Sequence, residues 1–507
     1  SRSGQAYLES FESDQGIPVS LRESRWQFGS RPRSANGVDD LIPVFDTADA
    51  VQVTWQNLVV GRGGVVPEIR ARDIDPNLEV VGGQDQLETV WWGAVLPDTA
   101  GGQVRQDNSY AWVLPTRPNQ PRWRSVATGL STTGLDLSKN EYLEFWVLHD
   151  SLRTSEQAGV RIVVDLGRMS EEAIALGPES LTVAGADSVF TGKQYLGLGR
   201  LDTERQTTGV FNAATDDIGI LGDRPDALVV NGQPVSAPAL CQRQLSNDVP
   251  VYPWGDPGAR CSNGNGTLDT EDQDGDNVLD GQGGGEDALR WVVDLRASPY
   301  FVRDGVQNPD GSGWKLYRVP LRTPAFKLGT PNIRLVKQLR FTLVAEPDQG
   351  GPDLKAFFAL ARMRFLGAPW VRRSDSPVFG LDSATGAPVG EVVASTISTE
   401  DNGYTSPPGV VGELDKNTGG GGNTGTVVNE RSLRVVARQI VIGQRAEAYL
   451  RFPNGPQNLL RYRELRAWVR GVGPGWDNHD FEAYVRVGSD SRNFYTFQTP
   501  AQTTTWV

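Results

Sequence analysis

The chain has 507 residues, with 49 Lys and Arg against 62 Asp and Glu, so its net charge at pH 7 is −13. A nucleic-acid-binding protein normally carries a basic face, and this charge balance argues against such a partner. No apolar run approaches the roughly 18 residues of a transmembrane helix. With only two His and two Cys, the sequence offers little for His-based catalysis or a zinc site.

Short runs of alternating apolar and polar residues recur along the chain and predict half-buried antiparallel strands. In chain order these runs cover 160–167, 357–365, 446–452 and 481–487. In the second run, the alternation places Phe357, Ala359, Ala361, Met363 and Phe365 on one face, opposite Arg362 and Arg364. Helical periodicity is scarce, and its best example is a short helix over 170–176 capped by Ser170. The predicted fold class is all-β.

A weak internal repeat suggests how the chain is organised. Residues 142–147 resemble 464–469, and an alternating strand that ends in Gly follows each copy. We interpret them as two jelly-roll-like antiparallel β-sandwich modules, with Trp146 and Trp468 in the two cores. The predicted boundaries are 1–370 for the first module, with a loop-rich insertion at about 170–288, 371–430 for a connector with a Gly-rich run, and 431–507 for an incomplete second module.

The segment 261–287 is the most acidic part of the chain and predicts a calcium-binding loop. Calcium takes roughly six to eight oxygen ligands, which one short loop can supply. Two overlapping frames of this loop give the candidate ligands Asn263, Asn265, Asp269, Asp272, Asp274, Asp276 and Asp280. In the second frame Leu279 points into the fold, and Glu286 replaces a missing bidentate carboxylate. The alternative is a solvated acidic loop that binds no metal.

The two cysteines, Cys241 and Cys261, flank a loop rich in Pro and Gly. A pair that closes a short loop suits an oxidising compartment. We therefore predict a Cys241–Cys261 disulfide in an exported protein, and the alternative is two unpaired thiols.

No catalytic constellation emerges from the sequence. Neither His149 nor His479 has a recognisable catalytic partner, and the glycines at 419–422 lack the Lys-Ser/Thr of a P-loop. We therefore predict a protein that is not an enzyme. Two other hypotheses stay open: an extracellular carbohydrate-binding or adhesin module, in which aromatic residues such as Trp476 stack on sugar rings, and a glycoside hydrolase, which needs two suitably placed carboxylates.

Several segments along nearly the whole chain carry a resemblance to one family. They include AYLESFE at 6–12, WWGAV at 91–95, EYLEFWV at 141–147, TDDIG at 215–219, NGTLDTED at 265–272, WKLYRVP at 314–320 and RVGSD at 486–490. In this order they resemble the gliding-motility cell-surface protein SprA (Sov) family, the outer-membrane translocon of the type IX secretion system.

The resemblance implies a function in protein transport. Members of the family are much longer, form a very large outer-membrane β-barrel through which folded cargo leaves the cell, and carry soluble β-rich insertions. By this resemblance the chain is an internal piece of such a protein at the outer membrane or cell surface, attached to the membrane through barrel segments outside it. Its expected partners are other secretion-system proteins and secreted cargo, which it docks or gates as a scaffold. The family supplies no catalytic residues.

Overall fold

The computed structural model describes the chain in separate stretches, on which all structural statements below rest. The described residues are 16–22, 25–33, 45, 52–57, 69–76, 89–96, 122–149, 160–172, 180–182, 189–191, 201, 210, 212, 229–230, 233–234, 268, 270–281, 285–295, 297–309, 313–345, 354–367, 370–372, 378–379, 391–399, 401, 403–410, 414–415, 426–427, 430–438, 440, 445–450, 452, 458–459, 462–490 and 492–507.

The chain divides into two compact units. The larger unit comprises Gln15–Pro76 and Gln84–Leu366, and the other comprises Ser1–Asp14, Asn77–Gly83 and Gly367–Val507. Nearly all elements in both units are antiparallel strands, which confirms the predicted all-β class. The described residues include no helix with the length and hydropathy needed to cross a membrane.

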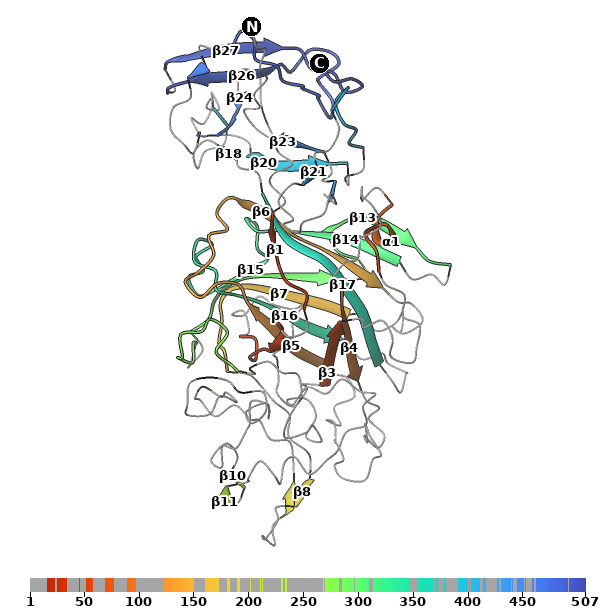
Figure 1. Ribbon diagram of the computed structural model, residues 1–507, viewed down its shortest axis with the longest axis vertical. Helices are drawn as coiled ribbons and strands as arrows, with labels where there is room; N and C mark the ends of the chain where they lie inside the picture. The colour runs from red at the N-terminus through yellow and green to blue at the C-terminus, as the bar shows by residue number, and fades with distance from the viewer. Residues whose placement is uncertain are drawn as a thin grey trace. The chain divides into compact units, whose positions relative to one another are not determined.

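Two antiparallel sheets build the larger unit (Figure 1). The first sheet has the strand order β13-β14-β6-β17-β4-β3, and β1 pairs with β17. Its strands are β1 (Ile17–Pro18), β3 (Gln52–Asn57), β4 (Thr89–Leu96), β6 (Asn140–His149), β13 (Phe301–Gln307), β14 (Gly313–Pro320) and β17 (Leu354–Gly367). The second sheet has the order β15-β12-β7-β16-β5-β2. Its strands are β2 (Gln27–Phe28), β5 (Arg122–Gly129), β7 (Val160–Arg168), β12 (Asp287–Asp294), β15 (Phe326–Leu328) and β16 (Gln338–Ala345).

The order of the long strands follows a regular scheme. From β4 through β5, β6, β7, β12, β14 and β16 to β17, the chain changes sheet at every connection except that from β7 to β12. We infer from this order the double Greek key of a jelly roll. The long connection between β7 and β12 contains two small pairs, β8 (Ser180–Thr182) with β9 (Val189–Thr191) and β10 (Val229–Val230) with β11 (Gln233–Pro234).

The inner faces of the two sheets share one apolar core, so the unit is sandwich-like. Phe145 of β6 packs against Tyr317 of β14 and against Phe341 of β16, with ring centroids 5.9 Å and 5.7 Å apart. Alternate residues of β7, namely Ile162, Val164 and Leu166, enter the same cluster, as period-2 alternation predicts. Burial of these large side chains is the main contribution to the stability of the unit.

Trp146 is fully buried, as predicted, but in a second cluster. It points to the opposite face of the first sheet from Phe145 and packs with Ile74, Trp314 and Ala361. Ile74 belongs to the short helix α1 (Ala71–Ile74), whose first turn is capped because Asp73 accepts a hydrogen bond from the backbone N–H of Arg70. The first sheet therefore has apolar cover on both faces.

The predicted common face of strand 357–365 is wrong. Arg362 has a φ of 48°, a left-handed conformation that interrupts the alternation. Leu360, Met363 and Phe365 lie in the central core, whereas Ala361 lies in the Trp146 cluster. An extra residue at a bulge inverts the faces beyond it, which simple period-2 alternation does not anticipate.

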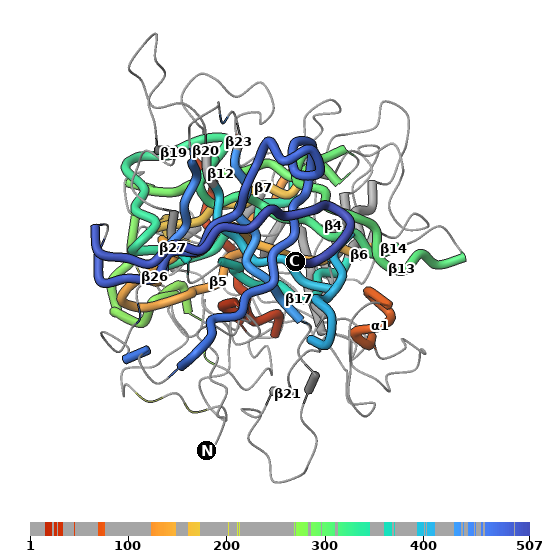
Figure 2. The backbone as a smooth tube through the Cα atoms, turned by 90° about the horizontal axis from the view of Figure 1, so that it is seen from above, coloured from red at the N-terminus to blue at the C-terminus, as the bar shows by residue number. Residues whose placement is uncertain are grey.

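The described strands of the C-terminal unit form two-stranded pairs. They are β18 (Val371–Arg372) with β25 (Ala448–Tyr449), β19 (Val378–Phe379) with β24 (Arg445–Ala446), β20 (Glu391–Ser398) with β23 (Arg431–Arg438), β21 (Leu414–Asp415) with β22 (Thr426–Val427), and β26 (Ala483–Gly488) with β27 (Phe494–Thr499). The last pair lies side by side in both views (Figure 2). Strand β20 falls inside the segment predicted to be a connector.

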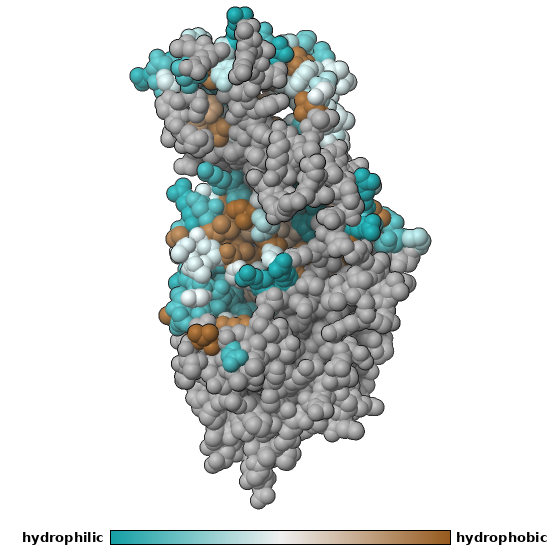
Figure 3. All heavy atoms as spheres, in the orientation of Figure 1, coloured by the Kyte–Doolittle hydropathy of each residue, from teal (hydrophilic) through white to brown (hydrophobic). Residues whose placement is uncertain are grey.

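Trp468 is not a core residue of the C-terminal unit. Its side chain is 49% exposed, and residues 464–470 form no strand. In an extended segment Trp468 shares a face with Glu464 and Arg466, which favours solvent for that face. Val469 instead makes two backbone hydrogen bonds of 2.9 Å with Val507. Apolar and hydrophilic side chains are interspersed on the visible face of this unit (Figure 3).

Candidate metal centre

The side chain of Asp272 organises the described part of the acidic loop by accepting hydrogen bonds from the loop backbone. Its Oδ1 accepts hydrogen bonds from the N–H groups of Gly275 and Asp276, at 2.7 and 3.1 Å, and its Oδ2 accepts one from Asn277 at 2.9 Å. Short Asp side chains favour such turns because they replace a backbone acceptor. Gly275 and Asn277 take left-handed φ values of 78° and 63°, which suit Gly and Asn.

The next carboxylates continue the turn with different exposure. Asp274 is buried, and its Oδ1 accepts a hydrogen bond from the N–H of Asp276 at 3.2 Å. Asp276 is exposed, and its Oδ1 accepts from the N–H of Val278 at 2.7 Å. Leu279 is buried and anchors the end of the loop, as its position in the second frame predicts.

Glu171 closes the loop from a distant part of the sequence. It follows β7, and its Oε1 accepts hydrogen bonds from the N–H of Gln273 at 3.0 Å and from Nε2 of Gln338 at 3.1 Å. Its Oε2 accepts from the N–H of Asp280 at 3.0 Å, and its own N–H donates to the carbonyl of Asp280 at 3.1 Å. The carboxylate of Glu171 thus connects both halves of the loop to the first residue of β16.

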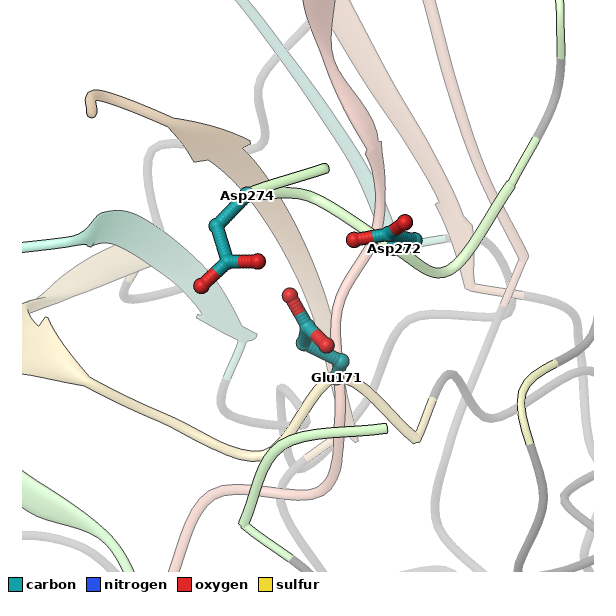
Figure 4. A group of neighbouring side chains, drawn as sticks. All are labelled: Glu171, Asp272 and Asp274. Carbon is teal, nitrogen blue, oxygen red and sulfur yellow. The ribbon is translucent and has the colours of Figure 1, made fainter. Parts of the chain in front are cut away.

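The side chains of Glu171, Asp272 and Asp274 point toward one another (Figure 4). One carboxylate oxygen of each lies within 4.8 Å of the others. Calcium–oxygen distances are about 2.3–2.6 Å, so two oxygens on opposite sides of an ion lie about 5 Å apart. The three carboxylates therefore fit around one cation, which backbone carbonyls and water would also have to coordinate.

The electrostatics of the group favour a positive charge nearby. Burial raises the pKa of Glu171 to about 7, and the neighbouring Asp274 and Asp280 raise it further against the opposing hydrogen bonds from the backbone. Lys337 supplies one cation: its Nζ contacts Asp274 and lies 3.0 Å from Oδ2 of Asp280. Hydrogen bonding to Asp274 is the main cause of the raised pKa of Lys337.

Only part of the predicted ligand set can be placed. Asp272 and Asp274 come together, whereas the exposed Asp276 lies outside this group of three and Asp280 contacts Lys337. The remaining candidates, Asn263, Asn265 and Asp269, lie outside the described residues, as do Cys241 and Cys261 and therefore the predicted disulfide.

Glu286 is wrong as a replacement ligand. Its Oε1 lies 2.6 Å from Nη1 of Arg340, and its Oε2 accepts a hydrogen bond from the N–H of Arg33. A buried guanidinium attracts a carboxylate strongly, and this pairing draws Glu286 away from the loop. Glu171 takes the closing role instead. Nothing local in the sequence signals this role, because Glu171 lies about a hundred residues before the loop, inside the segment whose pattern predicts a helix.

The predicted helix over 170–176 does not begin at its expected cap. Ser170, Glu171 and Glu172 are not helical, although Oγ of Ser170 accepts a hydrogen bond from the N–H of Glu172 at 3.3 Å. The remaining residues of that segment lie outside the described part of the chain. The non-helical course of the chain at 170–172 brings the carboxylate of Glu171 to the acidic loop.

The described residues define an all-β protein with a sandwich-like body and an acidic loop closed by a distant glutamate. No protein-family model matches the chain, and a search of curated proteins finds no significant match.

Proposed function

We propose that the chain is a non-enzymatic scaffold of an outer-membrane protein-secretion translocon of the SprA (Sov) family. It belongs at the cell surface and docks or gates secretion-system proteins and their cargo. The ordered sequence segments support the family. The way in which the buried charges of the larger unit pair with one another supports the scaffold role.

The second sheet provides the observation that carries the scaffold proposal. On its outer face, Asp165 of β7 lies between Arg290 of β12 and Arg340 of β16, and all three side chains are almost completely buried. Nη1 of Arg290 donates to the carbonyl of Arg33, and Nη1 of Arg340 donates to Oγ of Ser30. The charges thus hold three strands and the segment that covers them in one arrangement.

The first sheet repeats this device. Glu144 of β6 accepts from Nε of Arg318 on β14 and from Nη2 of Arg364 on β17, each at 2.7 Å. A carboxylate between two guanidiniums fixes neighbouring strands by direction as well as by charge. Within each sheet, charge-assisted hydrogen bonds therefore connect neighbouring strands. Such connections make the larger unit rigid, as a scaffold requires.

An internal deletion tests the transport role. In a bacterium that carries the gene, removal of residues 15–366 in frame is expected to abolish release of cargo into the medium while the rest of the protein stays in the outer membrane. The exposed-site variant Lys327→Met serves as the matched control and is expected to secrete normally. Normal secretion by the deletion strain would contradict the proposal.

Calcium is the ion that we propose Glu171, Asp272 and Asp274 bind. The carboxylate-only donor set and the 4.8 Å oxygen spacing support this choice, because calcium prefers oxygen ligands. Calcium added to protein treated with EDTA is expected to raise the melting temperature, since a ligand that binds the folded state stabilises it. A melting temperature that does not change with calcium would remove this part of the proposal.

A carbohydrate-binding or adhesin module is the second candidate. Tyr495 and Phe497 of β27 lie on one face of the β26–β27 pair and are 78% and 58% exposed, an arrangement that can stack on sugar rings. Trp476, which the sequence favours for this role, packs against Phe481 with ring centroids 5.6 Å apart. Stabilisation by a glycan that is lost in the double variant Tyr495→Ala/Phe497→Ala, but kept in Tyr462→Ala, would favour this candidate.

A further inference from the structure

The side chain of Lys337 reaches the acidic loop from a fixed backbone position immediately before β16. Its N–H donates to the carbonyl of Gly167 at 3.1 Å, and its own carbonyl accepts from the N–H of Leu130 at 2.7 Å. Both backbone groups are thus held by neighbouring segments of the sandwich. The flexible four-carbon side chain is the part that can move, and it brings the ammonium group to the loop.

The ammonium takes the carboxylate oxygens that the loop backbone does not use. Oδ1 of Asp274 accepts from the N–H of Asp276, whereas Oδ2 contacts Nζ of Lys337. The same Nζ lies 3.0 Å from Oδ2 of Asp280. Both oxygens of Glu171 and both of Asp272 accept backbone N–H groups. A second cation at Asp274 therefore meets a positive charge already in place, and two cations a few ångströms apart repel each other.

We infer that Lys337 is the resident counter-ion of the acidic loop: it keeps the loop folded without metal, and a divalent cation binds only by displacing it. Beyond the carboxylates themselves, the ammonium group of Lys337 places a positive charge at this position, from the residue that precedes β16. The inference rests on the proposed calcium role only for the identity of the displacing ion.

Isothermal titration with calcium chloride on EDTA-treated full chain tests the inference. The substitution Lys337→Met keeps the length of the side chain and removes its charge, and it is expected to raise calcium affinity about tenfold or more. Without calcium this variant is expected to melt below the wild type, and calcium is expected to restore its melting temperature. Lys337→Arg keeps the charge, and Lys327→Met removes a charge from the exposed face of β15; both are expected to bind calcium as the wild type does.

The outcomes separate this inference from the calcium proposal. Equal affinity in wild type and Lys337→Met overturns the inference and leaves the calcium proposal standing. Binding by Lys337→Met alone supports the inference and overturns calcium as a ligand of the natural protein. Absence of binding in both overturns both.

A measurement on the wild type covers the case in which the variant does not fold. An amine-reactive label followed by peptide mass spectrometry is expected to modify Lys337 more slowly than Lys327 in EDTA. With calcium bound, the two rates are expected to converge, because the displaced ammonium is free to react. If bound calcium leaves the labelling rate of Lys337 unchanged, the inference is wrong.

Discussion

Arg340 and Asp165 lie directly opposite each other on adjacent strands, with Nη2 of Arg340 2.7 Å from Oδ2 of Asp165. Arg290 occupies the matching position on the other side, with Nε 2.6 Å from Oδ1. Burial by itself raises the pKa of Asp165, but the two guanidiniums outweigh this effect and hold the pKa below its usual value. The aspartate therefore stays charged inside the protein.

Asp165→Asn is expected to destabilise the larger unit by about 3–5 kcal/mol, because it removes the buried carboxylate that Arg290 and Arg340 share, and Arg340 keeps only Glu286. Chemical denaturation of both proteins measures the difference. Asp304→Asn, on the exposed face of β13, is the matched control and is expected to change stability by no more than about 0.5 kcal/mol. Equal effects of the two substitutions would show that the ion pairs do not stabilise the sheet.

The buried Asp165 also predicts how the stability of the larger unit depends on pH. A carboxyl group whose pKa is lowered by folding stabilises the folded state at pH values above its pKa in the unfolded chain, here 3.8. This contribution is lost as the pH falls through the pKa of the folded state. The stability difference between wild type and Asp165→Asn is therefore expected to be constant above about pH 5 and to shrink below pH 3.8. A pH series of denaturant melts measures it; a difference that shrinks already near neutral pH would contradict the assignment.

Glu171 predicts the opposite dependence of stability on pH from Asp165. Its folded pKa, about 7, exceeds the usual value of 4.5, mainly because of burial. The stability contributed by its protonated form is fully present below pH 4.5 and is lost as the pH rises through 7. In EDTA, the wild type is thus expected to gain melting temperature relative to Glu171→Gln as the pH falls from 7 to 4.5. Parallel melting curves for the two proteins would refute this expectation.

Gly167 marks a close approach of β7 and β12. A Cβ at this position would lie 2.1 Å from the carbonyl oxygen of Asp287 and 2.9 Å from Cα of Ala288, so the strands would have to separate. Gly167→Ala is expected to cost about 2 kcal/mol or more. Gly285→Ala is the matched control, since a Cβ there meets nothing within 4 Å. Thermal unfolding compares the two, and equal melting temperatures would contradict the predicted clash.

Calcium binding is expected to depend on the loop carboxylates unequally. Asp272→Asn is expected to weaken binding about tenfold or more, because it removes charge from the group of three, whereas the exposed Asp276→Asn is expected to change affinity by about twofold at most. Titration calorimetry measures both. A larger loss in Asp276→Asn would place the ion on the outer side of the loop.

Local sequence patterns anticipated much of the sandwich. Alternation in β7 predicted which residues enter the core, because successive side chains of a strand point to opposite faces. The same rule failed in β17, where the left-handed backbone at Arg362 inverts the faces. It also could not show that Trp468, which was predicted to lie in a core, is half exposed. The carboxylates of Asp272 and Asp274 were identifiable because they are close in sequence and belong to an acidic run.

By itself the sequence determined the class of fold and the segment with the highest density of negative charge, since both follow from the order of neighbouring residues. The tertiary structure decided how the charges are used. It brought Glu171 and Lys337 to the loop, drew Glu286 away to Arg340, and placed Asp165 between two arginines. Each of these pairings joins residues far apart in the chain, and their energy depends on burial and distance, which only the packed sheets fix.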